Sequence, residues 1–179
     1  MMKLSENDVD HGMGVVVWIT GLSGSGKSTL GHGVCRALRA EGAAVVYLDG
    51  DVLREILGAV DAYSLEERRA LASTYARMCK VLAEQGLNVV CATISMYHSV
   101  REWNREHIPG YVEVYLRVPM AELRRRDPKG LYARGVNMAG LDMPFEEPEA
   151  PDLVIDNFGI TDVVRAERLI LDLLGKGQT

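Results

Sequence analysis

The stretch VVVWITGLSGSGKST, residues 15–29, joins a short apolar run to a glycine-rich turn and to the beginning of a helical pattern. Residues 15–20 are rich in β-branched side chains and have the length of a buried strand. In residues 28–42 apolar side chains recur with helical spacing, and the segment stops at Gly42, as helices commonly stop at a glycine. The sequence therefore predicts a strand, a tight turn and a helix in immediate succession.

The turn itself, Gly21 to Ser28, matches the pattern G-x-x-x-x-G-K-[ST] at every fixed position. Glycines let the backbone aim successive N–H groups at one point, and the following helix adds the positive end of its dipole. We therefore expect Lys27 to reach the β- and γ-phosphates of ATP and the Ser28 hydroxyl to ligate Mg²⁺. The alternative, a glycine-rich turn with a chance lysine, is disfavoured by the strand before it and the helix after it. The ATP-binding residues expected in this turn are Gly21, Ser23, Gly24, Ser25, Gly26, Lys27, Ser28 and Thr29.

The rest of the chain alternates apolar runs with helical patterns. Ser64 and Glu67 form an S-x-x-E capping box at the start of one of these helices, which Gly86 closes. Further strands are expected at residues 44–48, 87–94, 111–118 and 152–157, and further helices at residues 64–85, 120–127 and 162–174. Continuous apolar strands separated by helices indicate a parallel sheet covered on both faces. The sequence thus predicts an α/β protein, a three-layer α/β/α P-loop NTPase fold with a five-stranded parallel sheet, whose ligands bind at the carboxyl ends of the strands.

Composition and charge exclude several classes of function. The chain has 179 residues, the length of one domain, and its net charge of −5 argues against a broad nucleic-acid or anionic-membrane surface. No apolar run approaches the ~20 residues that a membrane span requires. Residues 1–13 lack the apolar segment of a signal peptide and are expected to form a disordered tail, leaving residues 14–179 as a single domain.

The three cysteines, Cys35, Cys79 and Cys91, have neither the spacing of a metal site nor that of a redox pair. Small buried thiols in a reducing cytoplasm are the expected interpretation. A cytoplasmic protein is therefore predicted.

Two aspartates, in LDGD, follow the second predicted strand. This strand end should lie beside the phosphate-binding turn, where both a carboxylate for the metal and a base for an acceptor hydroxyl are needed. The spacing does not decide which of Asp49 and Asp51 serves which purpose. The alternative is an Asp-Gly turn in which Asp51 caps a helix that begins at Val52.

A basic segment, ELRRRDPKGLYARG, stands out in this acidic protein. Its cations are Arg124, Arg125, Arg126, Lys129 and Arg134. A basic flap over a phosphate-transfer site excludes water and supplies charge to the transition state, so residues 124–142 are predicted to form a lid. The alternative is a solvated helix end whose cations suit the helix dipole.

Histidines give weaker indications. His98 follows the third predicted strand at the ligand-facing edge, so a role in substrate binding and a structural role are equally compatible with its position. His32 lies in the first helix, where packing or surface exposure is expected.

Several segments resemble the adenylylsulfate (APS) kinase family. GLSGSGKSTL, LDGD with Arg54 following, YSLEER, RDPKGLY and AGLDMPFEEPEAPDLVID occur in the family's order over nearly the whole chain. The resemblance implies a P-loop kinase with a single domain, Mg-ATP on the phosphate loop and a closing lid. It also implies transfer of the γ-phosphate to the 3′-hydroxyl of APS, giving PAPS, the activated sulfate donor, with Lys27, Asp49 and Asp51 as catalytic residues.

The same resemblance implies roles for individual positions. It implies that Asp49 is the metal-associated carboxylate, that Ser28 is the second metal ligand, and that Asp51 is the base. On the ATP side it adds Arg126, Lys129 and Asn157, and on the acceptor side it adds Asp51, Arg54, Arg68, Ser95, His98, Lys129 and Met138.

The departures from the family pattern fall on the acceptor side. Val52 replaces the usual Asn, Leu71 and Ser73 replace an Asn and an Arg, and Met138 stands where a Phe stacks on the acceptor's adenine. A missing aromatic stack is worth ~1–3 kcal/mol per base, and lost hydrogen-bond partners discriminate between substrates still more strongly.

The expected activity is therefore phosphorylation of a hydroxyl on a small nucleotide-type acceptor, with APS as the first candidate. The alternative acceptor is cytidine diphosphoramidate, used in polysaccharide modification, because SVREWNRE and PDLVIDN resemble that branch. A nucleotide-binding regulatory module is a further alternative, against which both aspartates and the basic lid argue. Nucleic-acid and membrane partners are not expected, and a homodimer is left open.

Overall fold

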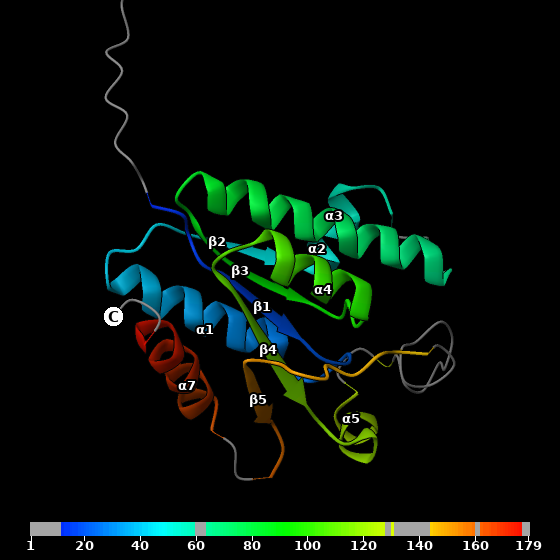
Figure 1. Ribbon diagram of the computed structural model, residues 1–179. Coiled ribbons are helices and arrows are strands. Elements are labelled where there is room, and N and C mark those ends of the chain that lie inside the picture. The colour runs from blue at the N-terminus through cyan, green and yellow to red at the C-terminus, as the bar shows by residue number, and fades with distance from the viewer. Residues whose placement is uncertain (1–11, 60–63, 128–129, 131–143, 160–161, 177–179) are drawn as a thin grey trace, which may run out of the picture.

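The structure, a computed structural model, describes residues 12–59, 64–127, 130, 144–159 and 162–176. In these residues a central sheet is flanked by helices on both sides (Figure 1). Its strands are β1 (Val16–Thr20), β2 (Val45–Asp49), β3 (Asn88–Thr93), β4 (Tyr111–Arg117) and β5 (Leu153–Asp156). They lie in the order β2-β3-β1-β4-β5, and every neighbouring pair is parallel. The predicted five-stranded parallel sheet is confirmed.

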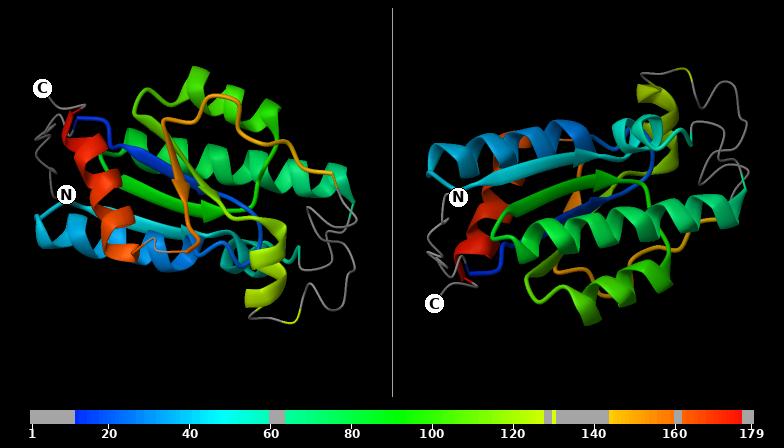
Figure 2. Two further views of the ribbon diagram at one scale, coloured as in Figure 1. Left: turned by 90° about the horizontal axis from the view of Figure 1, so that it is seen from below. Right: turned by 90° about the horizontal axis from the view of Figure 1, so that it is seen from above.

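The helices form two layers that cover opposite faces of the sheet, as the views from below and above show (Figure 2). They are α1 (Lys27–Ala40), α2 (Gly50–Ile56), α3 (Leu65–Glu84), α4 (His98–His107), α5 (Met120–Arg126) and α7 (Val163–Lys176). Along β1, Val16 and Trp18 pack against α3 and α4, whereas Val17 and Ile19 pack against α1 and α7. Because both faces of the strand are buried, its sequence is a continuous apolar run rather than an alternating one.

The predicted helix boundaries hold at α3 and fail at α2. The side chain of Ser64 accepts a hydrogen bond from the Glu67 amide and the Glu67 carboxylate accepts one from the Ser64 amide, which confirms the capping box. At α2, Asp49 rather than Asp51 is the N-cap, since its carboxylate accepts the Asp51 amide at 2.9 Å. The alternative with Asp51 as the cap is wrong because the helix begins at Gly50, two residues before the expected start.

One helix, α4, is absent from the elements expected from the sequence. Its buried residues are Val100, Arg101 and Asn104, so two of the three inward positions are polar and the apolar spacing that reveals a helix is lost. Arg101 is buried because it pairs with Glu113 on β4, with Nε 3.3 Å from Oε1. Arg105 donates to the other oxygen of Glu113 at 2.7 Å.

This ion-pair network also holds the segment that precedes β5. Arg101 donates to the carbonyl of Glu147 at 3.2 Å, and Arg105 donates to the carbonyl of Ala150 at 2.6 Å. Burial raises the pKa of Glu113, and the two arginines only partly oppose this effect.

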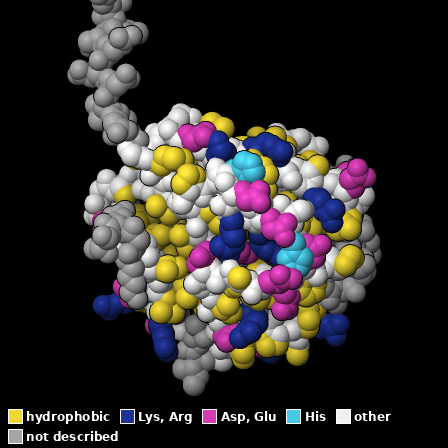
Figure 3. Space-filling view, in the orientation of Figure 1, with side chains coloured by type: hydrophobic (Ala, Val, Ile, Leu, Met, Phe, Trp, Pro, Cys, Tyr) yellow, Lys and Arg dark blue, Asp and Glu magenta, His cyan; other side chains and the backbone are white. Residues whose placement is uncertain are grey.

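Charged side chains of both signs are interspersed on the face of the molecule seen in Figure 3.

The three cysteines are free and buried, as predicted. Among the helices of the described ranges, none combines the length and the apolar character needed to cross a membrane. Residues 1–11 of the predicted tail, and residues 128–129 and 131–142 of the predicted lid, lie outside the described residues.

Replacing Glu113 by Ala should lower the free energy of unfolding by about 3–5 kcal/mol, because the buried Arg101 guanidinium loses its partner. Urea unfolding monitored by circular dichroism measures this change. Glu102→Ala, at an exposed position of α4, the helix that carries Arg101, is the control and should change stability by no more than about 0.5 kcal/mol. Equal stability of the two variants would contradict a structural role for the pair.

Candidate active site

The glycine-rich turn connects the end of β1 to the first residue of α1. Gly24 and Gly26 have φ angles of +75° and +97°, a region that side chains with a Cβ rarely occupy. Gly26 is the N-cap of α1, and no side chain caps the helix there. The first N–H groups of α1 are therefore open to an anion, as phosphate binding requires.

Lys27 and Ser28, at the start of α1, form hydrogen bonds with different parts of the chain. The ammonium group of Lys27 donates to the Leu22 carbonyl at 2.8 Å, so it lies across the turn. The hydroxyl of Ser28 donates to Oδ2 of Asp49 at 2.8 Å. Since its single proton is donated to Asp49, the lone pairs of the Ser28 oxygen are left for another ligand.

Asp49 lies in a dense set of donors. Tyr47 donates its hydroxyl to the same oxygen that Ser28 contacts, at 2.9 Å, and the Asp51 amide donates to the other oxygen. Burial raises the pKa of Asp49, but hydrogen bonds from Ser28, from the Asp51 amide and from Tyr47 outweigh it and the net pKa is lowered. Asp49 is thus an ionised carboxylate at neutral pH.

The oxygens of Ser28 and Asp49 suit Mg²⁺, which prefers hard oxygen ligands and keeps several waters or phosphate oxygens of its own. Within the described ranges, no three His, Cys, Asp or Glu side chains lie together as a metal cage. A site of one hydroxyl and one carboxylate is the kind that binds Mg²⁺ through a nucleotide's phosphates.

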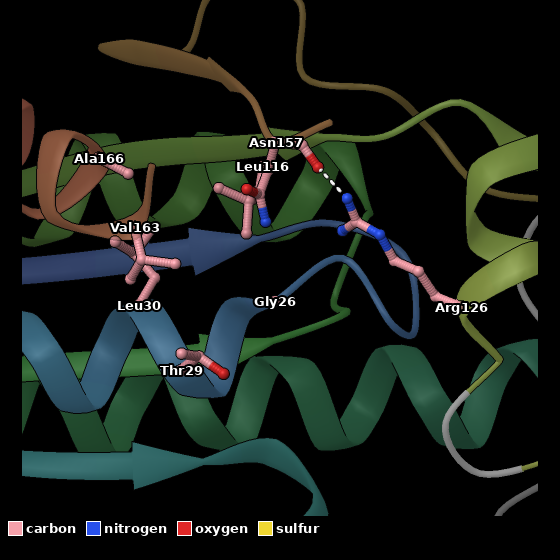
Figure 4. A pocket seen from close by; sticks show the side chains of 8 residues that line it. All are labelled: Gly26, Thr29, Leu30, Leu116, Arg126, Asn157, Val163 and Ala166. Atoms are coloured by element: carbon pink, nitrogen blue, oxygen red, sulfur yellow. Dashed lines mark hydrogen bonds between the residues drawn. The ribbon is translucent and has the colours of Figure 1, made fainter. Parts of the chain in front are cut away.

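A cavity of about 260 Å³ adjoins the turn on the side of α7 (Figure 4). Arg126 and Asn157 form its polar edge. Arg126 donates to the backbone carbonyl of Asn157 at 2.7 Å, and the side-chain amide of Asn157 donates to the backbone carbonyl of Ser25 at 2.7 Å. The lining residues are Gly26, Thr29, Leu30, Leu116, Arg126, Asn157, Val163 and Ala166. Such a mixture of apolar walls and a few placed polar groups is typical of a small-molecule site.

The sequence predicted part of this cavity. Thr29, Arg126 and Asn157 were expected to bind ATP, and they line it. Leu30, Leu116, Val163 and Ala166 were missed, because in sequence they are indistinguishable from other core positions of α1, β4 and α7. No pattern in the sequence distinguishes them as cavity residues.

Tyr97, which follows β3, lies in a positively charged environment. Burial raises the pKa of Tyr97, whereas the positive charges of Arg68, Arg69 and Arg54 oppose that rise. The guanidinium of Arg69 lies 5.6 Å from the centre of the Tyr97 ring. The role of Arg54 and Arg68 on the acceptor side stays a prediction. Arg69 and Tyr97 were not among the residues predicted from the sequence.

Ser95 and His98 have partners within the protein. The hydroxyl of Ser95 lies 2.6 Å from that of Thr93, and both side chains are buried. Nδ1 of His98 lies 2.8 Å from Nη2 of Arg101, and its other ring nitrogen lies 3.6 Å from Glu149. These contacts favour the structural alternative for His98, whose role in substrate binding stays a prediction.

The basic segment is only partly described. Arg125 and Arg126 both pair with Glu122, and their hydrogen bonds lower its pKa to about 2. Lys129 and Met138, two of the predicted site residues, lie outside the described residues, as does Arg134.

Replacing Gly26 by Ala should weaken the binding of an ATP analogue by about tenfold or more. The positive φ angle disfavours a side chain, and a Cβ would lie 2.7 Å from the Asn157 amide nitrogen. Gly42→Ala is the matched control, since its φ is +85° but its Cβ would have no neighbour within 4 Å. Calorimetric titration should show normal affinity for this control; normal affinity of the Gly26 variant as well would contradict a binding role for the turn.

Comparison with known proteins supports the identity of this site. Residues 13–156 match the family model described as adenylylsulphate kinase. The cytidine diphosphoramidate kinase of Campylobacter jejuni is 42% identical over 147 residues, which are 79% of this chain and 85% of that protein. The adenylyl-sulfate kinase of Paraburkholderia xenovorans is 38% identical over 171 residues, which are 92% of this chain and 96% of that protein.

A solved structure agrees with these relatives. The Mycobacterium tuberculosis APS kinase in complex with AMPPNP and APS has a TM-score of 0.84 and 33% identity, covering 91% of this chain and 98% of that one. The family match spans most of the sequence, and both relatives are more than 30% identical over more than two thirds of this chain. The chain therefore belongs to the adenylylsulphate kinase family of phosphotransferases, whose acceptor is an alcohol group.

Proposed function

We propose that this protein transfers the γ-phosphate of ATP to the ribose 3′-hydroxyl of a small, anionic nucleotide-type acceptor. The observation that carries this proposal is the 2.8 Å hydrogen bond from Ser28 to Asp49. It joins the phosphate-binding turn to the strand end that also carries Asp51, so a donor phosphate and a base for the acceptor share one edge of the sheet.

ATP binds with its phosphates on the turn and its base in the cavity beside Asn157. The cavity supports this orientation because Gly26 belongs both to the turn and to the cavity wall. The apolar side chains of Leu30 and Leu116 offer surfaces to a purine ring, and Arg126 offers a planar cation that stacks on aromatic rings. Ser28 and Asp49 would hold Mg²⁺, which would supply positive charge to the phosphates of the nucleotide.

Transfer requires mainly positioning and charge. Lys27 leaves the Leu22 carbonyl for the γ-phosphate, where with the turn's amides it stabilises the charge of the transition state. Asp51 accepts the proton of the acceptor hydroxyl. At the same time the hydroxyl oxygen bonds to the γ-phosphorus, and the bond between the γ-phosphorus and the bridging oxygen of the β-phosphate breaks. ADP and the phosphorylated acceptor then leave.

The acceptor side suits a negatively charged nucleotide. The positive charges of Arg54, Arg68 and Arg69 act on Tyr97, and arginines bind sulfate and phosphate groups with paired hydrogen bonds. APS is the first candidate, since the relative from Paraburkholderia xenovorans is an adenylyl-sulfate kinase and the similar solved structure contains APS.

A second candidate is cytidine diphosphoramidate. The relative of that name has the higher identity, 42% against 38%. Val52, Leu71 and Ser73, where the family usually has polar groups for its acceptor, also favour a changed acceptor. Both candidates have a ribose hydroxyl and a doubly anionic bridge, so one site chemistry serves either.

Replacing Lys27 by Ala should lower kcat by about 10²–10³-fold, as the loss of a transition-state donor does, with an unchanged unfolding temperature. Lys80→Ala is the matched control, since Lys80 lies on α3 and pairs there with Glu84. A coupled assay of ADP release measures both variants. Near-normal turnover of the Lys27 variant would refute the assignment.

The acceptor is identified by comparing kcat/KM for APS and for cytidine diphosphoramidate, each with saturating ATP. A ratio of about tenfold or more in favour of APS is expected, with product phosphorylated at the 3′-hydroxyl. The opposite ratio would assign the second candidate. Turnover of neither, with ATP-analogue binding intact, would refute a nucleotide-type acceptor and favour a regulatory module.

A further inference from the structure

Tyr47 lies two residues before Asp49 on β2, so both side chains extend from the same face of the strand. Its hydroxyl donates to Oδ2 of Asp49 at 2.9 Å, the oxygen that also accepts the Ser28 hydroxyl at 2.8 Å. The other oxygen of Asp49 accepts the Asp51 amide at 2.9 Å. Both carboxylate oxygens are therefore fixed by donors from three different parts of the chain.

The ring of Tyr47 is held in place by α1. A Cβ at position 31 would lie 2.6 Å from Cε2 of Tyr47, so the ring occupies the space that Gly31 leaves empty. The His32 ring packs against it with a centroid distance of 4.1 Å. The Tyr47 phenol carries its proton at neutral pH, so its hydroxyl can donate to Asp49.

We propose that Tyr47 is a positioning residue that holds Asp49 for the metal-dependent binding of the nucleotide. This inference rests on the proposed function. Ser28 has one proton and gives it to Asp49, so the direction of its lone pairs depends on where the Asp49 oxygen lies. The N-cap bond from Asp51 restrains one carboxylate oxygen, and Tyr47 supplies the restraint on the other.

A purely structural role for Tyr47 makes a different prediction. If the ring only fills the space beside Gly31, removing the hydroxyl should change stability and leave the metal response intact. If the hydroxyl orients Asp49, its removal should change the metal response while the packing of the ring is preserved. Groups that orient metal-associated carboxylates typically alter metal affinity or activity by about 10–100-fold when removed.

The experiment compares wild-type protein with Tyr47→Phe by calorimetric titration of AMPPNP, with and without Mg²⁺. For the variant, the gain in affinity that Mg²⁺ confers should fall by about tenfold, with affinity in the absence of Mg²⁺ within about twofold. In turnover assays, kcat should fall while KM for the acceptor stays unchanged. Tyr111→Phe is the matched control, because Tyr111 begins β4 at the opposite end of the sheet and should leave the Mg²⁺ response unchanged.

A double-mutant cycle with Asp49→Asn tests whether Tyr47 acts through Asp49. Tyr47→Phe should have no further effect on the Mg²⁺ response in the Asp49→Asn background, whereas additive effects would overturn the inference. An unchanged Mg²⁺ response in Tyr47→Phe would also overturn it, as would a fall in unfolding temperature of more than about 10 °C, since the hydroxyl would then support the core. The proposed function fails separately, if the wild-type protein shows no Mg²⁺-dependent AMPPNP binding.

Discussion

The geometry of the candidate active site depends on one hydrogen bond, from Ser28 at the start of α1 to Asp49 at the end of β2. Helix α1 follows β1 in the chain, and β1 and β2 are not neighbours in the sheet, because β3 lies between them. Helix α1 crosses from the end of β1 over β3 and β2, and its first turn therefore reaches the carboxyl end of β2. This strand–helix–strand connection thus brings the phosphate-binding turn to the aspartates.

Two regions adjoin this contact. The first, on the side of α1 and α7, is the cavity beside Asn157, which continues directly from the turn through Gly26. The second, on the side of α2 and α3, contains Tyr97 with the Arg69 guanidinium 5.6 Å from its ring centre. The buried pair of Arg101 and Glu113 supports the second region, since it holds the chain before β5, which carries Glu146 next to the His98 amide. Under the proposed function, the nucleotide donor binds in the first region and the anionic acceptor in the second.

Much of the fold, including the turn at the candidate site, could be predicted because it depends on local patterns. The turn, the capping box of α3 and the five apolar strands each depend on short-range spacing, and all are found where expected. Helix α4 could not be predicted, since its buried face carries the polar residues Arg101 and Asn104, and the burial of Arg101 depends on its ion pair with Glu113 on another element, β4. The cap of α2 was assigned to the wrong aspartate because two candidates stood two residues apart, and only the backbone geometry distinguishes them.

The sequence by itself determined the phosphate-binding turn, the parallel sheet and the pair of aspartates, because glycine spacing and strand ends are properties of neighbouring residues. Only the tertiary structure decided what those groups contact. Tyr47 reads as an ordinary strand residue until α1 brings Gly31 against its ring, and Arg69 reads as a surface cation until Tyr97 lies beneath it. The physical reason is that hydrogen bonds and ion pairs between distant residues depend on distances that packing sets, and no local pattern records those distances.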